Sequence, residues 1–355
     1  MPSPTLTAAS PGEFRAPAAE QSAPISALTY DSTVSRAMVH RRAVAEVFVT
    51  DAAPEPDGRY AVAAQFPRGH SFFNDGPGGY HDLMMVAEAV RQAGVYIAHA
   101  YFGLPADRPF IFGRLDLAAD GLAAVLAGPR PSQARILADP VPTGPQGRAM
   151  RGLDFTGTVQ IDDAADTIGG GASLLFMSPR GYQAFRERAR QGALAGGEQS
   201  TPPERLRAAV SPCPPALVGR TNEANVVVGN LVARDERTVS TAVLVDVNHP
   251  VLFDHPLDHV PGMLLLEAAR QGAVVAASRL AGLAPAKAVV TACRASFTTF
   301  TELDLALSLT VRIESPTAAA PAAAGSQGSP LLARAEFVQA GKPVAKVEVE
   351  VTRCP

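Results

Sequence analysis

The sequence matches itself when it is shifted by 179 residues. Between positions 70 and 95, nine of 26 residues are identical to the residue 179 positions later, without a gap. Unrelated chains of ordinary composition would share about two. The same offset aligns Arg41 with Arg220 and the run at 46–50 with the run at 225–229. A constant offset over more than 50 residues indicates an internal duplication, so we expect two copies of one structural unit.

Each half shows the same order of predicted elements. In each half, two short runs that are β-branched or alternate between apolar and polar residues predict strands. They lie at 45–51 and 59–66 in the first half and at 225–231 and 237–247 in the second. A loop rich in His, Asp, Gly and Pro follows. A long apolar run then predicts a helix, at 81–103 in the first half and at 262–282 in the second. Both helices are apolar on nearly every face, which indicates that they are buried.

Further strands are predicted after each helix, at 110–117, 172–178, 288–297, 305–314, 330–339 and 342–352. A long buried helix wrapped by an antiparallel sheet is the hot-dog arrangement. The predicted fold class is therefore α+β, a tandem (double) hot-dog whose two sheets are joined side by side.

The remaining segments have the composition of linkers or disordered chain. The first 27 residues are rich in Pro, Ala and Ser, the segment 188–215 mixes Gly, Pro and charge, and 314–330 is a low-complexity loop. We divide the chain into a disordered tail (1–27), a first hot-dog domain (28–190), a linker (191–213) and a second hot-dog domain (214–355).

Composition excludes several classes of function. The 355 residues carry a formal net charge of −3, and the lack of a basic surplus argues against binding to nucleic acid or a membrane surface. Cys213, Cys293 and Cys354 lie far apart without CxxC spacing, which argues against a disulfide framework or a metal site. No apolar run reaches the about 18 residues of a membrane-spanning helix. The N-terminus lacks the basic start and apolar core of a signal peptide, so we expect a cytoplasmic protein that uses no metal or cofactor.

The repeated helices each place a glutamate three residues before an arginine, as Glu88 and Arg91 and as Glu267 and Arg270. This spacing puts both side chains of a pair on one helical face. One interpretation is a structural ion pair that ties helix to sheet. The other is chemical: a glutamate as general base, an arginine as a bidentate phosphate ligand, and the N–H groups at the helix start polarising a carbonyl. The sequence leaves both open.

The histidines and arginines of the loops also allow two interpretations. His70 and His249 match across the repeat, which favours a role in shaping the turn. The second loop alone contains His255 and His259, and we include both, with Asp254, as substrate-binding candidates. Arg41 and Arg220 are candidates for anion binding or for pairing within the fold. No cysteine lies near the start of either repeated helix, so we expect no covalent acyl-enzyme.

Four segments resemble the A-factor biosynthesis (AfsA-type) hot-dog family: VHRRAVAEVFVTD (39–51), QFPRGHSFFND (65–75), HDLMMVAEAVRQAGVYIAHAYFGLP (81–105) and HPVLFDHPLDHVPGMLLLEAARQGA (249–273). The resemblance covers both repeats. It implies an acyltransferase that joins a β-ketoacyl group from acyl carrier protein to the hydroxyl of dihydroxyacetone phosphate. The product would lead to a γ-butyrolactone, butenolide or furan signal that controls secondary metabolism.

The resemblance also implies site residues. Glu88, Glu267 and Arg270 match the family's important positions, with either glutamate as the base and Arg270, together with Arg91, holding the phosphate. A weaker resemblance to hot-dog dehydratases rests on the Pro-Gly and the Glu-Ala-x-x-Gln helix, but the loop from His255 to Pro261 is shorter than theirs. The alternatives are a thioesterase, a dehydratase, or a non-catalytic regulator that binds the signal. The fused pair is expected to be a monomer or to form a homodimer.

Overall fold

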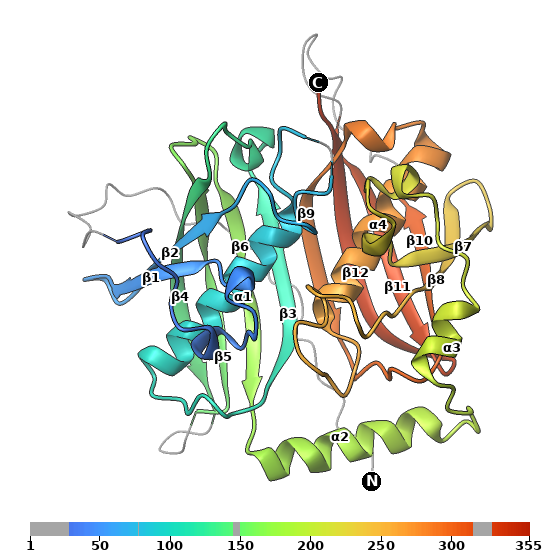
Figure 1. Ribbon diagram of the computed structural model, residues 1–355, viewed down its shortest axis with the longest axis horizontal. Coiled ribbons are helices and arrows are strands. Elements are labelled where there is room, and N and C mark those ends of the chain that lie inside the picture. Colours follow the sequence, from blue (N-terminus) through green and yellow to red (C-terminus); the bar gives the residue numbers. More distant parts are fainter. Residues whose placement is uncertain (1–27, 77, 145–149, 315–328) are drawn as a thin grey trace.

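One antiparallel sheet of twelve strands runs through the computed structural model, which describes residues 28–76, 78–144, 150–314 and 329–355 (Figure 1). The first half contributes β1 (Val49–Pro54), β2 (Tyr60–Phe66), β3 (Phe110–Ala119), β4 (Ser132–Thr143), β5 (Gly152–Ile161) and β6 (Ile168–Phe176). The second half contributes β7 (Val228–Ala233), β8 (Thr238–Val243), β9 (Ala288–Phe297), β10 (Leu307–Ile313), β11 (Leu331–Gln339) and β12 (Lys342–Arg353).

The strand order is a mirror image about its centre. It reads β1-β2-β4-β5-β6-β3 in the first half and β9-β12-β11-β10-β8-β7 in the second, so that β3 and β9 pair at the junction. Asp116 and Arg294 face each other there as register partners, with a carboxylate–guanidinium distance of 3.4 Å. The halves are therefore related by a pseudo-twofold axis at this junction, and the predicted double hot-dog with joined sheets is confirmed.

Two long helices, α1 (Leu83–Ala100) and α4 (Gly262–Ala281), lie side by side on the same face of the sheet (Figure 1). Most of their residues are buried, as their apolar sequences predict. Asp82 caps α1 by accepting a hydrogen bond from the N–H of Met84 at 3.0 Å. Gly282 ends α4 with a φ of 66°, a backbone conformation that favours glycine.

The structure differs from the sequence-based expectation in three places. The strands β4 and β5 were not predicted. The strands β1 and β7 begin four and three residues later than expected, because short 3₁₀ turns occupy 44–46 and 223–225. Part of the segment 188–215, expected to be loose, is helical, since α2 (Pro179–Leu194) extends into it and α3 (Pro203–Ala208) lies within it. The expected tail, 1–27, and most of the loop 314–330 lie outside the described residues.

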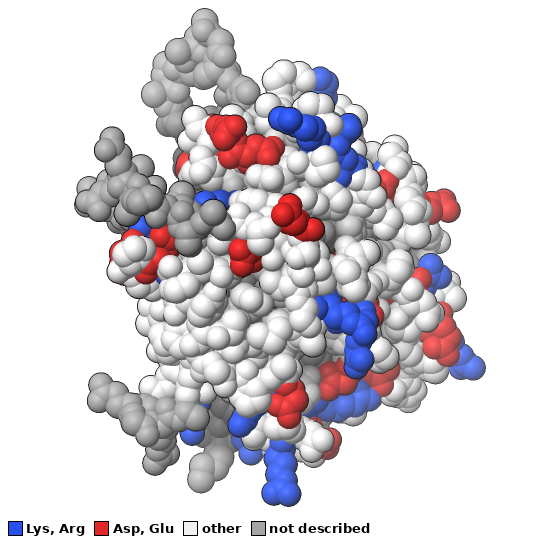
Figure 2. Space-filling view, turned by 60° about the vertical axis from the view of Figure 1, so that its left-hand side comes forward, with Lys and Arg blue, Asp and Glu red and all other residues white. Residues whose placement is uncertain are grey.

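The surface carries its charges in small groups. On the face in Figure 2, the described basic and acidic side chains lie near one another, between wide uncharged areas. Among the described residues, the helices include none whose length and apolar character suit it to crossing a membrane.

Gly94 tests how tightly α1 packs on the sheet. A Cβ added there would lie 2.4 Å from the ring of Phe155 on β5, which is itself buried. We expect Gly94→Ala to destabilise the fold by roughly 1–2 kcal/mol, since overpacking outweighs the gain in helix propensity. The matched control is Gly192→Ala in α2, where a Cβ meets no atom within 4 Å. Thermal unfolding followed by circular dichroism should show a lower Tm for the first variant only; equal or higher values for both would contradict this packing.

Candidate active site

Each buried helix carries a glutamate whose carboxylate is enclosed by two arginines and a glutamine. In α4, Glu267 accepts hydrogen bonds from Nε of Arg270 at 2.7 Å and from Nη2 of Arg220 at 2.8 Å. The side-chain amide of Gln271 donates to the same carboxylate at 2.5 Å. In α1 the counterparts at the same offset repeat the arrangement: Glu88, Arg41, Arg91 and Gln92. We call these sets the first (Glu88) and second (Glu267) carboxylate clusters.

The clusters keep both glutamates ionised. Burial alone would raise the pKa of Glu88 and of Glu267, but the neighbouring guanidinium groups outweigh it and hold each pKa at about 2. The side chains of both are at most 1% exposed. A carboxylate with such a low pKa and with its oxygens occupied is a weak proton acceptor. The geometry therefore favours an orienting role, and the catalytic roles of Glu88 and Glu267 stay predictions.

The glutamine of each cluster ties its helix to the segment that leads into the edge strand. Gln92 donates to the carbonyl oxygen of Glu46 at 2.7 Å and accepts from the N–H of Phe48 at 2.9 Å. Gln271 makes the matching pair of bonds in the second half. The Glu, Arg and Gln thus share one helical face because their spacing is i, i+3 and i+4.

The matched aspartates of the loops join the two halves. Asp254 accepts hydrogen bonds from the backbone N–H groups of Arg42 and Ala43 in the first half, at 2.5 and 2.8 Å. Asp75 accepts the reciprocal bonds from the backbone at 221–222 in the second half. The side chain of Asp254 is only 1% exposed. This carboxylate is thus committed to the contact between the halves, and the role of Asp254 in substrate binding stays a prediction.

The matched histidines shape the turns, in agreement with one of the two interpretations above. Nδ1 of His249 accepts hydrogen bonds from the N–H groups of Val251 and Leu252, at 3.2 and 3.1 Å. His70 makes the same two bonds in the first half. Both rings are buried, and they hold the loops that lead toward the two helices.

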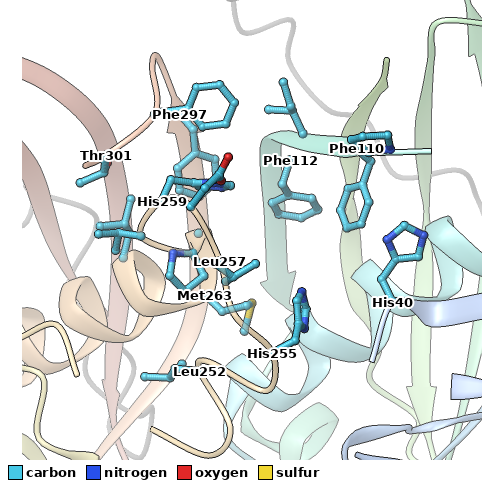
Figure 3. Close-up of a pocket in the computed structure, with 18 of the residues that line it drawn as sticks. His40, Phe110, Phe112, Leu252, His255, Leu257, His259, Met263, Phe297 and Thr301 are labelled. Carbon is cyan, nitrogen blue, oxygen red and sulfur yellow. The ribbon is translucent and has the colours of Figure 1, made fainter. Parts of the chain in front are cut away.

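A cavity of about 460 Å³ lies where the start of α4 meets the first half. We call it the first cavity. Figure 3 shows Phe297, Leu257 and Met263 of the second half on one side, and Phe110 and Phe112 of the first half on the other. Tyr182 and Phe185 of α2 also contribute to its wall. The cavity is thus built from both halves and from the helix that connects them.

Polar groups gather at one end of the first cavity, where Arg41, Arg91, His40 and His255 line it. Arg91 uses Nε and Nη2 for Glu88 and for the carbonyl oxygen of Val39. Its Nη1 makes no hydrogen bond with any described residue, so one edge of this guanidinium is available to a ligand. That edge is suited to a phosphate or another anion.

His40 is a neutral acceptor beside this arginine. Nδ1 of His99 lies 2.7 Å from the carbonyl oxygen of Leu104 and must donate to it. Nε2 of His99 therefore accepts from Nε2 of His40 at 2.9 Å, which leaves Nδ1 of His40 without a proton. Burial, together with the nearby His99 and Arg91, lowers the pKa of His40 to about 3. The ring is thus uncharged at neutral pH.

A carboxylate–imidazole pair stands in the wall of the same cavity. Oδ1 of Asp258 lies 2.6 Å from Nδ1 of His259, and the hydroxyl of Tyr182 donates to the same carboxylate at 2.9 Å. Burial would raise the pKa of Asp258, but its contacts with His259 outweigh this and lower the pKa. An ionised carboxylate only accepts, so Nδ1 of His259 carries the proton and Nε2 is left as a proton acceptor.

The start of α4 faces the first cavity without a cap. Pro261 precedes the helix and offers no side-chain cap, and the N–H groups of Gly262 and Met263 make no hydrogen bond with any described residue. The start of α1 differs, because Asp82 caps it and is itself held by Arg220 at 2.9 Å. The start of α4 thus leaves the N–H groups of Gly262 and Met263 free at its cavity, whereas at the start of α1 the N–H of Met84 is capped.

A second cavity of about 310 Å³ occupies the related position at the start of α1. Its wall includes Asp82, Arg270 and two arginines of the first half, Arg68 and Arg130. None of the described residues that line it comes from α2. The duplicated frame thus supports two different cavities.

The structure separates the residues that the sequence grouped as one site. It places Arg91, His255 and His259 at the first cavity and Arg270 at the second. His40, Asp258 and Tyr182 were not predicted. The adjacent Asp258 and His259 were a usable sequence signal, since neighbouring Asp and His side chains on a loop often pair. The partners of His40 and Tyr182 lie 59 and 76 residues away in sequence, and no local pattern reveals them.

Comparison with known proteins agrees with this architecture. The model of the A-factor biosynthesis hotdog domain matches residues 26–169 and 201–355. A 2-oxo-3-(phosphooxy)propyl 3-oxoalkanoate synthase of Streptomyces virginiae is 34% identical over 275 residues, 77% of this chain and 85% of that protein. The synthase of the same name from Streptomyces coelicolor is 32% identical over 68% of this chain and 71% of that protein. A dehydratase of type I polyketide synthases aligns over 85% of this chain and 97% of that chain, at 13% identity and a TM-score of 0.46, a similarity too low to add to the assignment.

The fold and the junction cavities define a double hot-dog protein. More narrowly, the chain belongs to the A-factor biosynthesis hotdog family, whose model matches both halves. This confirms the resemblance found in the sequence.

The carboxylate clusters predict how stability depends on pH. The pKa of Glu88 and of Glu267 is about 2 in the fold, against 4.5 for an ordinary glutamate. Their stabilising contribution is therefore complete above about pH 4.5 and is lost as the pH falls toward 2. Glu267→Gln should cost about 3–5 kcal/mol at neutral pH, because Arg220 and Arg270 stay buried without their counter-ion.

Urea unfolding between pH 7 and pH 3 measures both effects. The wild-type protein should lose stability more steeply below pH 4.5 than Glu267→Gln, which lacks one of the two low-pKa carboxylates. Equal acid slopes in the two proteins would show that Glu267 is not held ionised as described.

Proposed function

We propose that this protein transfers a β-ketoacyl group from the thioester of acyl carrier protein to the hydroxyl of dihydroxyacetone phosphate. The product ester would be the precursor of a γ-butyrolactone, butenolide or furan signal. Family membership supports the reaction class, because the similar proteins from Streptomyces bear the name 2-oxo-3-(phosphooxy)propyl 3-oxoalkanoate synthase. The observation that carries the proposal is the first cavity, which combines an apolar wall, an available arginine edge and a proton acceptor.

The apolar wall is suited to the acyl chain. Phenylalanines from both halves and side chains of the loop before α4 face one another across the first cavity (Figure 3). Burial of each methylene of a chain in such a wall contributes about 0.8 kcal/mol. Tyr182 and Phe185 place α2 beside this wall, so that α2 helps to exclude water from the thioester.

The Asp258–His259 pair is the proposed base. Nε2 of His259 takes the proton of the triose hydroxyl, while Asp258 stabilises the imidazolium that forms. The oxygen attacks the thioester carbonyl carbon, and the N–H groups of Gly262 and Met263 stabilise the negative charge on the carbonyl oxygen. The new C–O bond forms as the C–S bond breaks, and His259 returns the proton to the carrier thiolate. No cysteine of the chain is among the residues that line the cavity, in keeping with direct transfer.

Arg91 is the proposed phosphate ligand. Arg91 lines the cavity, its Nη1 makes no hydrogen bond with any described residue, and Glu88 fixes the plane of its guanidinium through two hydrogen bonds. Arg41 and His255 lie at the same end and extend the polar wall. In this proposal Glu88 is a positioning residue. Glu267 and Arg270 play no part in the chemistry, because Arg270 lies at the other cavity.

Thioester hydrolysis, dehydration and simple binding of the signal are the competing functions. A thioesterase would release a free β-keto acid without any triose phosphate, and a dehydratase would act on a β-hydroxyacyl thioester. A binding protein would turn over neither. The pairing of a base with a free arginine edge in one cavity favours transfer to a phosphorylated acceptor.

A mutation of His259 tests the proposed base. His259→Ala should lower kcat for ester formation by about 10²–10⁴-fold, the usual effect of losing a general base. Asp258→Asn should lower kcat as well, since the imidazole loses its orienting carboxylate. The assay is mass spectrometry of the product from β-ketoacyl carrier protein and dihydroxyacetone phosphate. Arg188→Ala, an exposed change on α2, is the control; full activity of His259→Ala would exclude this residue as the base.

Substitutions of Arg91 and Arg270 test which cavity binds the phosphorylated acceptor. Arg91→Lys keeps a positive charge beside Glu88 but loses the free Nη1, so the KM for dihydroxyacetone phosphate should rise about tenfold with little change in kcat. The KM for the acyl donor should stay constant. If Arg270→Lys raises the KM for the triose and Arg91→Lys does not, the reaction takes place in the second cavity and the proposal is wrong.

A further inference from the structure

The helix α2 connects the two halves and contacts the second half through one face. None of its residues is buried, so apolar burial contributes little to its position. α2 runs along the lower edge of the molecule in Figure 1, away from α1 and α4. Its position therefore depends on polar and aromatic contacts. The side chains that make these contacts share one helical face: Tyr182, Phe185, Arg186 and Arg190.

A buried carboxylate of the second half anchors α2. The side chain of Glu302 is 1% exposed and accepts hydrogen bonds from both Nη atoms of Arg186, at 2.6 and 2.7 Å. Arg190 donates to Glu302 at 2.7 Å and to Asp304 at 2.7 and 2.6 Å. A bidentate pair of guanidinium and carboxylate has a strict geometry. Arg186 is thus fixed in place on the second half.

The same arginine also reaches Asp258. Nη2 of Arg186 donates to the backbone carbonyl oxygen of Asp258 at 2.6 Å, and its Nε lies 3.5 Å from the carboxylate. The hydroxyl of Tyr182 donates to one oxygen of this carboxylate at 2.9 Å and lies 3.2 Å from the other. The side chain of Asp258 is 50% exposed, so without these partners it would adopt several rotamers. α2 therefore fixes both the backbone and the carboxylate of the residue that holds His259.

The ring of His259 is held indirectly by α2 as well. It packs edge to face on Phe300, with centroids 4.7 Å apart. Phe300 is 7% exposed, and the rings of Tyr182 and Phe185 pack against it at 5.8 and 5.6 Å. The guanidinium of Arg186 lies 5.2 Å from the centre of the same ring. Both neighbours that orient the imidazole, the aspartate and this phenylalanine, thus contact α2.

The first cavity has both α2 and the carboxylate–imidazole pair, whereas the described wall of the second cavity contains neither. The described residues that line the second cavity include none of α2. The positions that correspond to Asp258 and His259 in the first half are Gly79 and Tyr80. This association supports a link between the helix and the pair.

We infer that Arg186 and Tyr182 are positioning residues, through which docking of α2 orients the Asp258–His259 pair at the first cavity. This role rests on the proposed function of His259 as the base. Because α2 also forms part of the cavity wall, closure of the wall and orientation of the base take place together. A base that is oriented only under a closed wall protects the thioester from attack by water.

Proton NMR of the full chain tests this orientation without turnover. The Nδ1 proton of His259, held against Asp258 at 2.6 Å, should give a downfield signal that is absent from His259→Ala. Tyr182→Phe removes one hydroxyl, and Arg186→Gln removes the cation. Each should move this signal upfield or broaden it, because the carboxylate is no longer held. The matched control, Arg188→Gln, changes an exposed arginine of the same helix and should leave the signal as in the wild type.

Ester formation gives a second readout, which separates orientation from a purely structural effect. Arg186→Gln should lower kcat about tenfold, the effect of losing a hydrogen bond to a charged group, with little change in the KM for the acyl donor. In the His259→Ala background the same change should lower kcat no further, because it acts only through the imidazole. Circular dichroism checks that each variant is folded.

Two results would overturn the inference. One is a His259-dependent signal that is the same in the wild type, Tyr182→Phe and Arg186→Gln. The other is an equal relative loss of kcat from Arg186→Gln in both backgrounds, since α2 would then act only as a wall. If the wild type forms no ester or His259→Ala is fully active, the proposed function fails, whereas the NMR signal still shows whether α2 orients the pair.

Discussion

The carboxylate cluster is the interaction on which both halves depend. A glutamate buried at the core of a hot-dog helix would be costly without partners. Two arginines and a glutamine supply hydrogen bonds to it, and one arginine of each set reaches in from the segment before the edge strand. The cluster therefore joins helix, edge strand and turn. Each cluster sets two guanidinium groups against one glutamate, and in the second cluster Asp82 also pairs with Arg220.

The two halves share the helix, the edge strand and the carboxylate cluster, but their loops differ. The cluster residues and the turn histidines are the same in both halves, so each helix is tied to its edge strand and its turn in the same way. The loop residues that face the cavities differ: His255 and His259 have Gly76 and Tyr80 as counterparts, and the uncapped Pro261 has Asp82. Because the helices and carboxylate clusters are the same in both halves while the loops differ, one cavity is lined by imidazoles and the other by arginines.

The repeat and the apolar helices allowed the fold to be predicted, because both are local or periodic signals. The unpredicted strands β4 and β5 alternate regularly in burial, but proline, glycine and short polar residues interrupt their sequences. The candidate site was harder to predict. Glu88 and Glu267 stood out as chemical groups in the sequence, yet one of the two arginines that lower each pKa comes from a segment 47 residues earlier. Whether such a carboxylate can act as a base or only forms structural ion pairs thus depends on partners that are distant in sequence, and the local motif does not reveal them.

The same reasoning explains why the proposed base lies on a loop. A helix residue in this fold is buried on nearly every side, so an ionised group there must be neutralised by partners that also remove its basicity. A loop residue at the cavity wall keeps one side free. His259 is held by Asp258 at Nδ1 and by the ring of Phe300, with centroids 4.7 Å apart, while its other nitrogen remains a proton acceptor. The buried helices therefore supply rigidity and oriented donors, and the loop before α4 supplies the group that can exchange a proton.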